Sequence, residues 1–140
     1  YATSSWVLLD INNRTLLRPN AIDRLGTIEA DLSDMYEIQD RRIKFNTAEM
    51  NKTDVREVYY SQIDRNGHMN NTFYPDIVYD YFPNEHKISD IGKKFSIYYS
   101  SEVMCGEKFE VYTAENNGEF HFVAKNPTTG KDIFSALIDF

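Results

Sequence analysis

The chain has 140 residues and a formal net charge of −7, from 15 Lys and Arg against 22 Asp and Glu. This length fits one domain whose core needs no disulfide or metal to hold it. The acidic balance argues against binding to nucleic acid or to an anionic membrane surface, because both need a basic face. No apolar run approaches the roughly 20 residues that cross a bilayer. The single cysteine, Cys105, favours a reducing compartment, so we expect a cytoplasmic protein.

The first part of the chain predicts a short strand pair and a connector. Residues 2–11 predict a strand, Asn12-Asn13 a turn, and residues 15–18 the returning strand. Residues 20–51 are polar, with apolar residues at spacings of three and four. This spacing indicates short helical pieces within a connector.

The rest of the chain predicts a strand, a helix and then four more strands. Residues 55–63 predict the strand, 63–71 a polar loop and 72–82 the helix. Thr72 is the expected N-cap, because Pro75 then falls in the first turn, where a helix tolerates proline.

Four strands are expected after the helix, joined by tight turns. Their predicted ranges are 95–104, 108–115, 119–125 and 132–140. Asn117-Gly118 is the strongest hairpin signal in the chain, and residues 126–130 form a second turn. The order predicts an antiparallel sheet wrapped around one helix, which is an α+β domain.

The residues most suited to chemistry lie in the polar loop. Asp64, Asn66 and His68 alternate, so in an extended loop their side chains share one side. Gly67 permits a tight backbone path and leaves its N–H open to a substrate oxygen. A helix N-terminus follows, and its free N–H groups suit a developing oxyanion. The loop is therefore suited to ester or thioester hydrolysis, although the same residues also make an ordinary turn.

Three segments resemble one known family. Residues 60–74, Y-S-Q-I-D-R-N-G-H-M-N-N-T-F-Y, resemble the D-x-N-x-H-V-N-N signature of the acyl-acyl-carrier-protein thioesterases, with Met69 in place of the usual Val. Residues 99–107, Y-S-S-E-V-M-C-G-E, resemble the strand that carries a catalytic Glu in that family, here Glu102. Residues 2–14, A-T-S-S-W-V-L-L-D-I-N-N-R, are similar to the segment that ends the first domain of the family.

The resemblance implies a tandem hot-dog architecture. Residues 1–20 would be closing strands of a first, mostly absent hot-dog domain, residues 21–50 a linker, and residues 51–140 the C-terminal hot-dog domain. It also implies hydrolysis of fatty acyl-acyl-carrier-protein thioesters to free fatty acid and carrier protein, which terminates fatty acid synthesis. The implied partners are acyl carrier protein and a second hot-dog domain, in this chain or in a homodimer, because edge strands usually pair. No cofactor or metal is implied.

The resemblance also assigns roles. Glu102 would be the general base that activates water. Asn66 and His68 would orient the water or polarise the carbonyl, and Asp64 would support the site. The expected substrate-binding residues are Gly67, Asn70, Asn71 and Phe73. Without the family pattern, the residues favour a solvated carboxylate at a strand end for Glu102 over a catalytic one.

Two other functions stay open. One is an acyl-coenzyme A thioesterase of the single-hot-dog type, in which an Asp also stands three residues before the Gly; the A-T-S-S-W segment counts against it. The other is a non-catalytic hot-dog module that holds a partner or an acyl chain. Intact Asp64, Asn66, His68 and Glu102 count against that second alternative.

The remaining candidates favour structural roles. We expect Cys105 to be a small buried residue, since no neighbouring base would activate its thiol. His86 is expected to be solvated, and His121 to lie at the surface or in packing. The aromatic residues around the helix are expected to pack it on the sheet: Tyr59, Phe73, Tyr74, Tyr81 and Phe82. The candidate basic patches for docking an acidic carrier protein are Arg41-Arg42-Lys44 and Lys93-Lys94.

Overall fold

The structure is a computed structural model, and it divides into two compact units, Tyr1–Arg41 and Arg42–Phe140. The residues that it describes are 8–10, 12–13, 15–17, 43–87 and 94–140. The predictions that fall outside these ranges are the strand before Leu8, the helical pieces up to residue 42, and the basic residues Arg41, Arg42 and Lys93.

In the first unit, two short strands form a hairpin. Strands β1 (Leu8–Leu9) and β2 (Leu16–Leu17) pair antiparallel. The Asp10 carboxylate accepts hydrogen bonds from the backbone N–H groups of Asn12, at 2.8 Å, and Asn13, at 3.3 Å. Within the described residues, this confirms the predicted strand pair and its turn.

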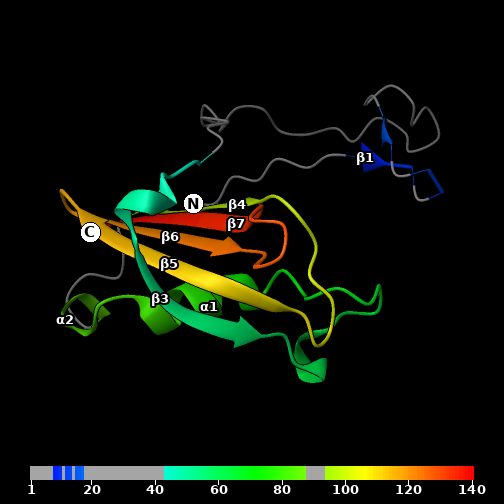
Figure 1. The fold of residues 1–140 in the computed structure, drawn as a ribbon, viewed down its shortest axis with the longest axis horizontal. Helices are drawn as coiled ribbons and strands as arrows, with labels where there is room; N and C mark the ends of the chain where they lie inside the picture. The colour runs from blue at the N-terminus through cyan, green and yellow to red at the C-terminus, as the bar shows by residue number, and fades with distance from the viewer. Residues whose placement is uncertain (1–7, 11, 14, 18–42, 88–93) are drawn as a thin grey trace, which may run out of the picture. The chain divides into compact units, whose positions relative to one another are not determined.

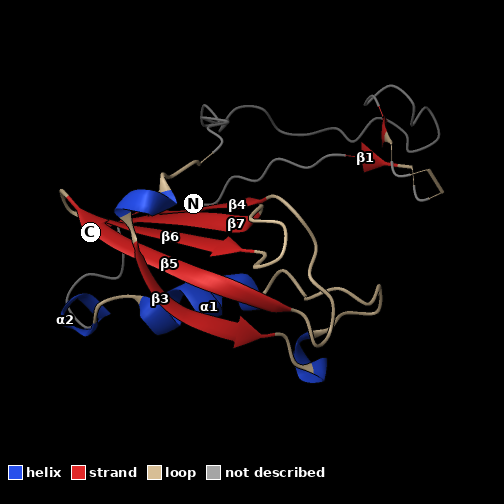
Figure 2. Cartoon of the chain, viewed as in Figure 1, coloured by secondary structure: helices blue, strands red, loops and turns tan. Residues whose placement is uncertain are grey.

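The second unit is a five-stranded antiparallel sheet with a helix along one face (Figure 1; Figure 2). The strand order is β3-β5-β6-β7-β4. The strands are β3 (Asn51–Glu57), β4 (Lys94–Tyr99), β5 (Lys108–Asn116), β6 (Glu119–Lys125) and β7 (Asp132–Asp139). The helix is α1 (Phe73–Tyr81), and a short α2 (Asn84–Lys87) follows it. This confirms the predicted α+β class. Among the described residues, no helix is long and apolar enough to cross a membrane.

The core lies between α1 and the sheet. Alternate residues of the central strands point into it, among them Phe120 and Phe122 of β6. Ile77 and Val78 of α1 are buried against them. Phe122 stacks on Phe134 of β7, with ring centroids 5.1 Å apart. Each such side chain contributes roughly 1.5–3 kcal/mol by leaving water.

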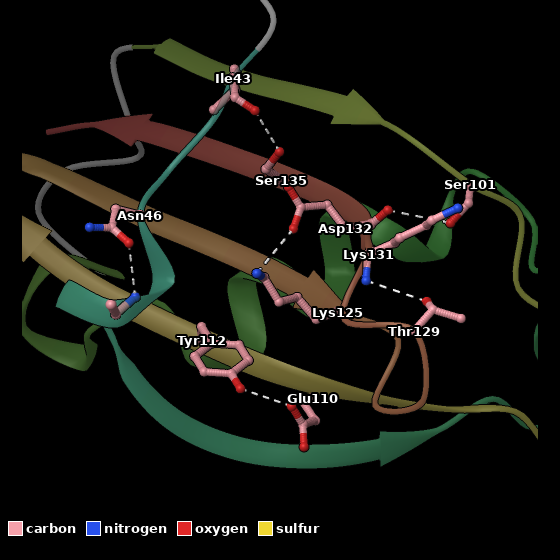
Figure 3. A network of polar contacts seen from close by, with 11 residues as sticks. Ile43, Asn46, Ser101, Glu110, Tyr112, Lys125, Thr129, Lys131, Asp132 and Ser135 are labelled. Atoms are coloured by element: carbon pink, nitrogen blue, oxygen red, sulfur yellow. Dashed lines mark hydrogen bonds and ion pairs between the residues drawn. The ribbon is translucent and has the colours of Figure 1, made fainter.

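The opposite face of the sheet is crossed by the chain just before β3. The buried hydroxyl of Ser135 donates a hydrogen bond of 2.9 Å to the carbonyl of Ile43 (Figure 3). Phe45 stacks on His121 with centroids 4.2 Å apart, which confirms a packing role for that histidine. A three-residue 3-10 helix, Thr47–Glu49, then leads into β3.

The strand predicted at residues 55–63 is wrong at both ends. β3 begins earlier, at Asn51, and ends at Glu57. A 3-10 turn, Tyr60–Gln62, replaces the end of the predicted strand. The side-chain oxygen of Gln62 accepts a hydrogen bond of 2.9 Å from the N–H of Tyr59, so the backbone turns instead of continuing the ladder.

The strand predicted at residues 95–104 is too long. β4 ends at Tyr99, because the carbonyl of Ile133 accepts from both Ser100 and Ser101 and the regular pairing with β7 stops there. Ser101 also donates through its hydroxyl to the carbonyl of Asp132, at 3.5 Å (Figure 3). Glu102 therefore lies in the loop after the strand and not within it.

The ends of α1 refine the prediction. Thr72 precedes the helix as predicted, but its side chain makes no capping hydrogen bond. The side-chain oxygen of Asn70 instead accepts from the N–H and the hydroxyl of Thr72, both at 3.1 Å. After the helix, His86 packs on Phe140 with centroids 4.0 Å apart, so its predicted solvation is wrong.

The two-residue turn Asn117-Gly118 provides the first test. Both residues have positive φ, +51° and +80°, as a type I′ hairpin requires. Gly118→Ala should lower the free energy of unfolding by more than Gly130→Ala, measured by chemical denaturation. Gly118 and Gly130 both have positive φ, so alanine at either position would add a backbone strain of about 1–2 kcal/mol. Only at Gly118 would the new Cβ also meet a backbone atom, the carbonyl oxygen of Phe140 at 3.3 Å. Equal losses would contradict this packing.

Candidate active site

Two segments far apart in the sequence meet at the predicted site. The N–H of Met69 donates a hydrogen bond of 2.8 Å to the carbonyl of Val103, and both side chains are buried. His68 forms an isolated antiparallel bridge with Met104. These contacts place the loop of residues 63–72 beside the segment that carries Glu102.

Asp64 organises the loop through its carboxylate. One carboxylate oxygen accepts from the N–H groups of Asn66, at 2.8 Å, and His68, at 3.3 Å. Its backbone N–H donates to the carbonyl of His68 at 2.9 Å. The Asp64 carboxylate therefore stabilises the loop by accepting backbone hydrogen bonds, which agrees with its predicted supporting role.

Gly67 has the backbone conformation that the tight loop needs. Its φ is +84°, a region that favours glycine. Its N–H donates to the carbonyl of Asp64 at 3.1 Å. The expectation of an open N–H at this position is therefore wrong.

His68 and Glu102 form the central pair. The Nε2 atom of His68 lies 3.1 Å from a carboxylate oxygen of Glu102. The His68 side chain is 17% exposed and that of Glu102 is 48% exposed, so the carboxylate reaches both the imidazole and solvent. A carboxylate held by an imidazole and open to water has the geometry of a general base.

Asn66 lies two residues before His68 in the same loop, and its side chain is exposed. Its amide nitrogen lies 3.5 Å from the second oxygen of Asp64, at the limit of a hydrogen bond. The carboxamide is therefore held only weakly and can turn toward a ligand.

The predicted substrate-binding residues at the start of α1 have structural contacts. Asn70 uses its side-chain oxygen to cap the helix. The carbonyl of Asn71 accepts from the Tyr99 hydroxyl at 3.5 Å, and Phe73 is partly buried against the core. Contact of these residues with a substrate stays a prediction.

Tyr74, in the first turn of α1, has a property that its sequence position did not indicate. The pattern grouped it with the other aromatics that pack the helix on the sheet, and nothing distinguished its hydroxyl. The side chain is 3% exposed. Burial raises the pKa of Tyr74 to about 12, helped by the negative charges of Tyr99, Glu102 and Asp64. The phenol therefore stays protonated near neutral pH.

Cys105 is exposed, so its predicted burial is wrong. Val103, two residues earlier, is the buried residue of this segment, because its carbonyl bonds to the loop and its side chain enters the core. Within the part of the chain that the structure describes, no group of three or more His, Cys, Asp or Glu side chains is placed to hold a metal ion.

A hollow of about 640 Å³ lies elsewhere, between β3 and α1. Its lining residues are Asp54, Val55, Arg56, Glu57, Tyr59, Asp80, Tyr81 and Lys108, none of which is a predicted site residue. Its charges are paired within the protein: Arg56 bonds to Asp80 and Tyr81 to Asp54, both at 2.6 Å. The hollow therefore lies away from the loop of residues 63–72, and Arg56 and Asp54 in its lining are bonded within the protein.

Comparison with solved structures defines the fold as a thioesterase-type hot dog. An acyl-ACP thioesterase from Bacteroides thetaiotaomicron matches with a TM-score of 0.69 and 22% identity. A 12:0-ACP thioesterase from Umbellularia californica matches with a TM-score of 0.75 and 16% identity. In both cases 94% of this chain is covered and 52% of the other, so the chain spans about half the length of these relatives.

Residues 45–140 match the acyl-ACP thioesterase C-terminal domain, and the chain belongs to this family. A Staphylococcus aureus protein solved in complex with CoA also matches, over 63% of this chain and 74% of its own, with 17% identity and a TM-score of 0.52. No curated protein matches the sequence.

The different structural roles of Asp64 and Asn66 in the loop can be tested by measuring the free energy of unfolding of variants. Asp64→Ala should lower the free energy of unfolding by roughly 1–3 kcal/mol, because two backbone N–H groups lose their acceptor. Asn66→Ala should change it by less than about 0.5 kcal/mol, since that side chain is exposed and weakly bonded. Chemical denaturation measures both. A larger loss for Asn66→Ala would contradict the assignment.

Proposed function

We propose that the protein hydrolyses fatty acyl thioesters of acyl carrier protein, releasing free fatty acid and carrier protein. The observation that carries this proposal is the pair of His68 and Glu102 at 3.1 Å, formed by the loop that contains Asn66 and leads into α1. Family membership supports the same reaction class. The reducing compartment expected from Cys105 agrees with a cytoplasmic enzyme of this kind.

In the proposed reaction, Glu102 accepts a proton from a water molecule. The water oxygen attacks the thioester carbonyl carbon and forms a tetrahedral oxyanion. The carboxamide of Asn66 and the positive end of the α1 dipole stabilise that charge. When the carbon–sulfur bond breaks, the proton held by Glu102 passes to the departing thiolate, so carboxylic acid and thiol are released and Glu102 is restored. His68 holds Glu102 in place throughout.

Glu102→Gln is the direct test of this mechanism. The amide cannot take a proton from water, so hydrolysis should fall roughly 100-fold or more, within the range that general-base catalysis supplies. The melting temperature should stay unchanged, because the side chain is half exposed.

Glu115→Gln is the matched control, since Glu115 is exposed at the far end of β5. Hydrolysis that is unchanged in Glu102→Gln would overturn the role of Glu102. An absence of hydrolysis in the parent protein would favour the non-catalytic module.

Substrate ranking separates the two enzyme hypotheses. Acyl-carrier-protein thioesters should give a higher kcat/KM than coenzyme A thioesters with the same acyl chain, because both acyl-ACP thioesterases match over nearly the whole chain. The CoA-bound relative matches over a smaller share. Steady-state kinetics with one acyl chain on both carriers measures the ranking, and the reverse order would favour an acyl-coenzyme A thioesterase.

The proposed second hot-dog domain would pair with one edge of the sheet, and the two edges differ. On β3, Asp54 and Arg56 turn charged side chains toward α1, and the pairing with β5 is irregular between Lys52 and Asp54. Such inward charges and irregularities protect an edge from further strands. On β4, Phe95 and Ile97 pack on the core and the register is regular. We therefore propose β4 as the pairing edge.

A further inference from the structure

We infer that Glu107 is a positioning residue for the proposed general base, Glu102. Its carboxylate holds the peptide unit between Val103 and Met104, which follows Glu102 in the chain. This inference rests on the proposed function, since it concerns the same site. Within residues 99–107, the family resemblance assigns a role to Glu102 alone. The support comes from the backbone contacts on both sides of this peptide unit.

The peptide unit between Val103 and Met104 is held from two sides. Its carbonyl, that of Val103, accepts a hydrogen bond of 2.8 Å from the N–H of Met69. Its N–H, that of Met104, donates to a carboxylate oxygen of Glu107, also at 2.8 Å. A trans peptide unit is planar, and its carbonyl and N–H point in opposite directions. The two bonds together therefore fix its orientation, and without Glu107 only the bond on the carbonyl side would remain of this pair.

Glu107 is itself fixed in the turn of residues 104–107. Its N–H donates to the carbonyl of Met104 at 3.2 Å, so both backbone groups of Met104 bond to Glu107. Gly106, in the third position of this turn, has a φ of +79°, which favours glycine. The N–H of Gly106 donates to the carbonyl of Val58 at 2.8 Å, and the N–H of Val58 donates to the carbonyl of Glu107 at 3.0 Å. Because Val58 is 1% exposed, the backbone of Glu107 is anchored to the core.

The orientation of this peptide unit determines where Glu102 lies. Val103 is buried, while Glu102 and Met104 on either side of it are exposed, as in a short extended segment. Met104 forms the isolated bridge with His68, whose Nε2 atom lies 3.1 Å from the Glu102 carboxylate. A rotation of the peptide unit would turn Val103 and move Glu102 relative to His68. Glu107 therefore acts on the proposed reaction through the backbone, without contact with the reacting atoms.

Glu107→Ala removes the acceptor and leaves the backbone bonds of the turn in place. Because misplacement of a catalytic group by about 1 Å can cost 100-fold, kcat should fall roughly 10- to 100-fold. KM should change far less, since the lost contact positions the base and binds no substrate. Glu107 is exposed, so the fold should persist. Glu107→Asp is a second variant with the same expected loss, because its shorter side chain keeps the charge but does not reach the N–H of Met104.

Glu107→Gln is the conservative variant. Its side-chain carbonyl has the same length and still accepts from Met104, although a neutral acceptor forms a bond about half as strong. It should therefore restore most of the kcat that Glu107→Ala loses. Glu57→Ala is the matched control for charge, because Glu57 is an exposed carboxylate at the end of β3 that pairs with Lys108 at 3.6 Å. Its kcat should equal that of the parent protein.

NMR gives two readouts that do not depend on activity. The nuclear Overhauser effect between the ring protons of His68 and the side-chain protons of Glu102 reports their approach. It should weaken in Glu107→Ala and persist in Glu107→Gln and Glu57→Ala. The amide of Met104 should exchange its hydrogen faster in Glu107→Ala alone of these three, because only that variant loses the acceptor.

The outcomes distinguish this inference from the proposed function. If Glu107→Ala keeps the kcat and the His68–Glu102 Overhauser effect of an active parent, the inference is wrong and the proposed function stands. If Glu107→Gln loses as much kcat as Glu107→Ala, the charge matters and not the bond to Met104, so the inference is again wrong. If the parent protein hydrolyses no thioester, the proposed function falls, and the Overhauser effect and amide exchange still decide the role of Glu107.

Discussion

The site depends on one backbone hydrogen bond, from the N–H of Met69 to the carbonyl of Val103 at 2.8 Å. The two residues are buried, so the bond is shielded from water and breaking it would leave unpaired polar groups in the core. It joins the loop before α1 to the segment after β4. Because His68 and Glu102 are the neighbours of these two residues, the same bond brings imidazole and carboxylate together.

Near this hydrogen bond, the carboxylates of Asp64 and Glu102 have different roles. Asp64 accepts backbone hydrogen bonds and shapes the loop. Glu102 is half exposed and paired with His68, so it can meet water. Tyr74 is buried in the core, and its raised pKa keeps it neutral at physiological pH. One carboxylate is thus committed to structure and the other is available for the proposed proton transfer, a separation that environment alone produces.

Local sequence patterns predicted well those strands and turns whose structure depends on their own residues. The strand predicted at residues 119–125, which is β6, and the Asn117-Gly118 turn are both confirmed. The ends of β3 and β4 were not predictable in this way. β4 stops because the distant Ile133 carbonyl accepts twice, and the turn after β3 depends on the Gln62 side chain. The motif resemblance identified Glu102 and His68, whose side chains the structure brings within 3.1 Å of each other.

The most direct test of the account is a single turnover of acyl-carrier-protein thioester in water enriched in oxygen-18. If Glu102 activates water, the fatty acid released in the first turnover carries one labelled oxygen, and the protein retains none. This labelling distinguishes water activation from a covalent acyl-Glu102 intermediate that water opens at the carboxyl carbon of Glu102, since only that route transfers an unlabelled oxygen from the carboxylate to the fatty acid. Unlabelled fatty acid in the first turnover, with label appearing on Glu102, would contradict the account.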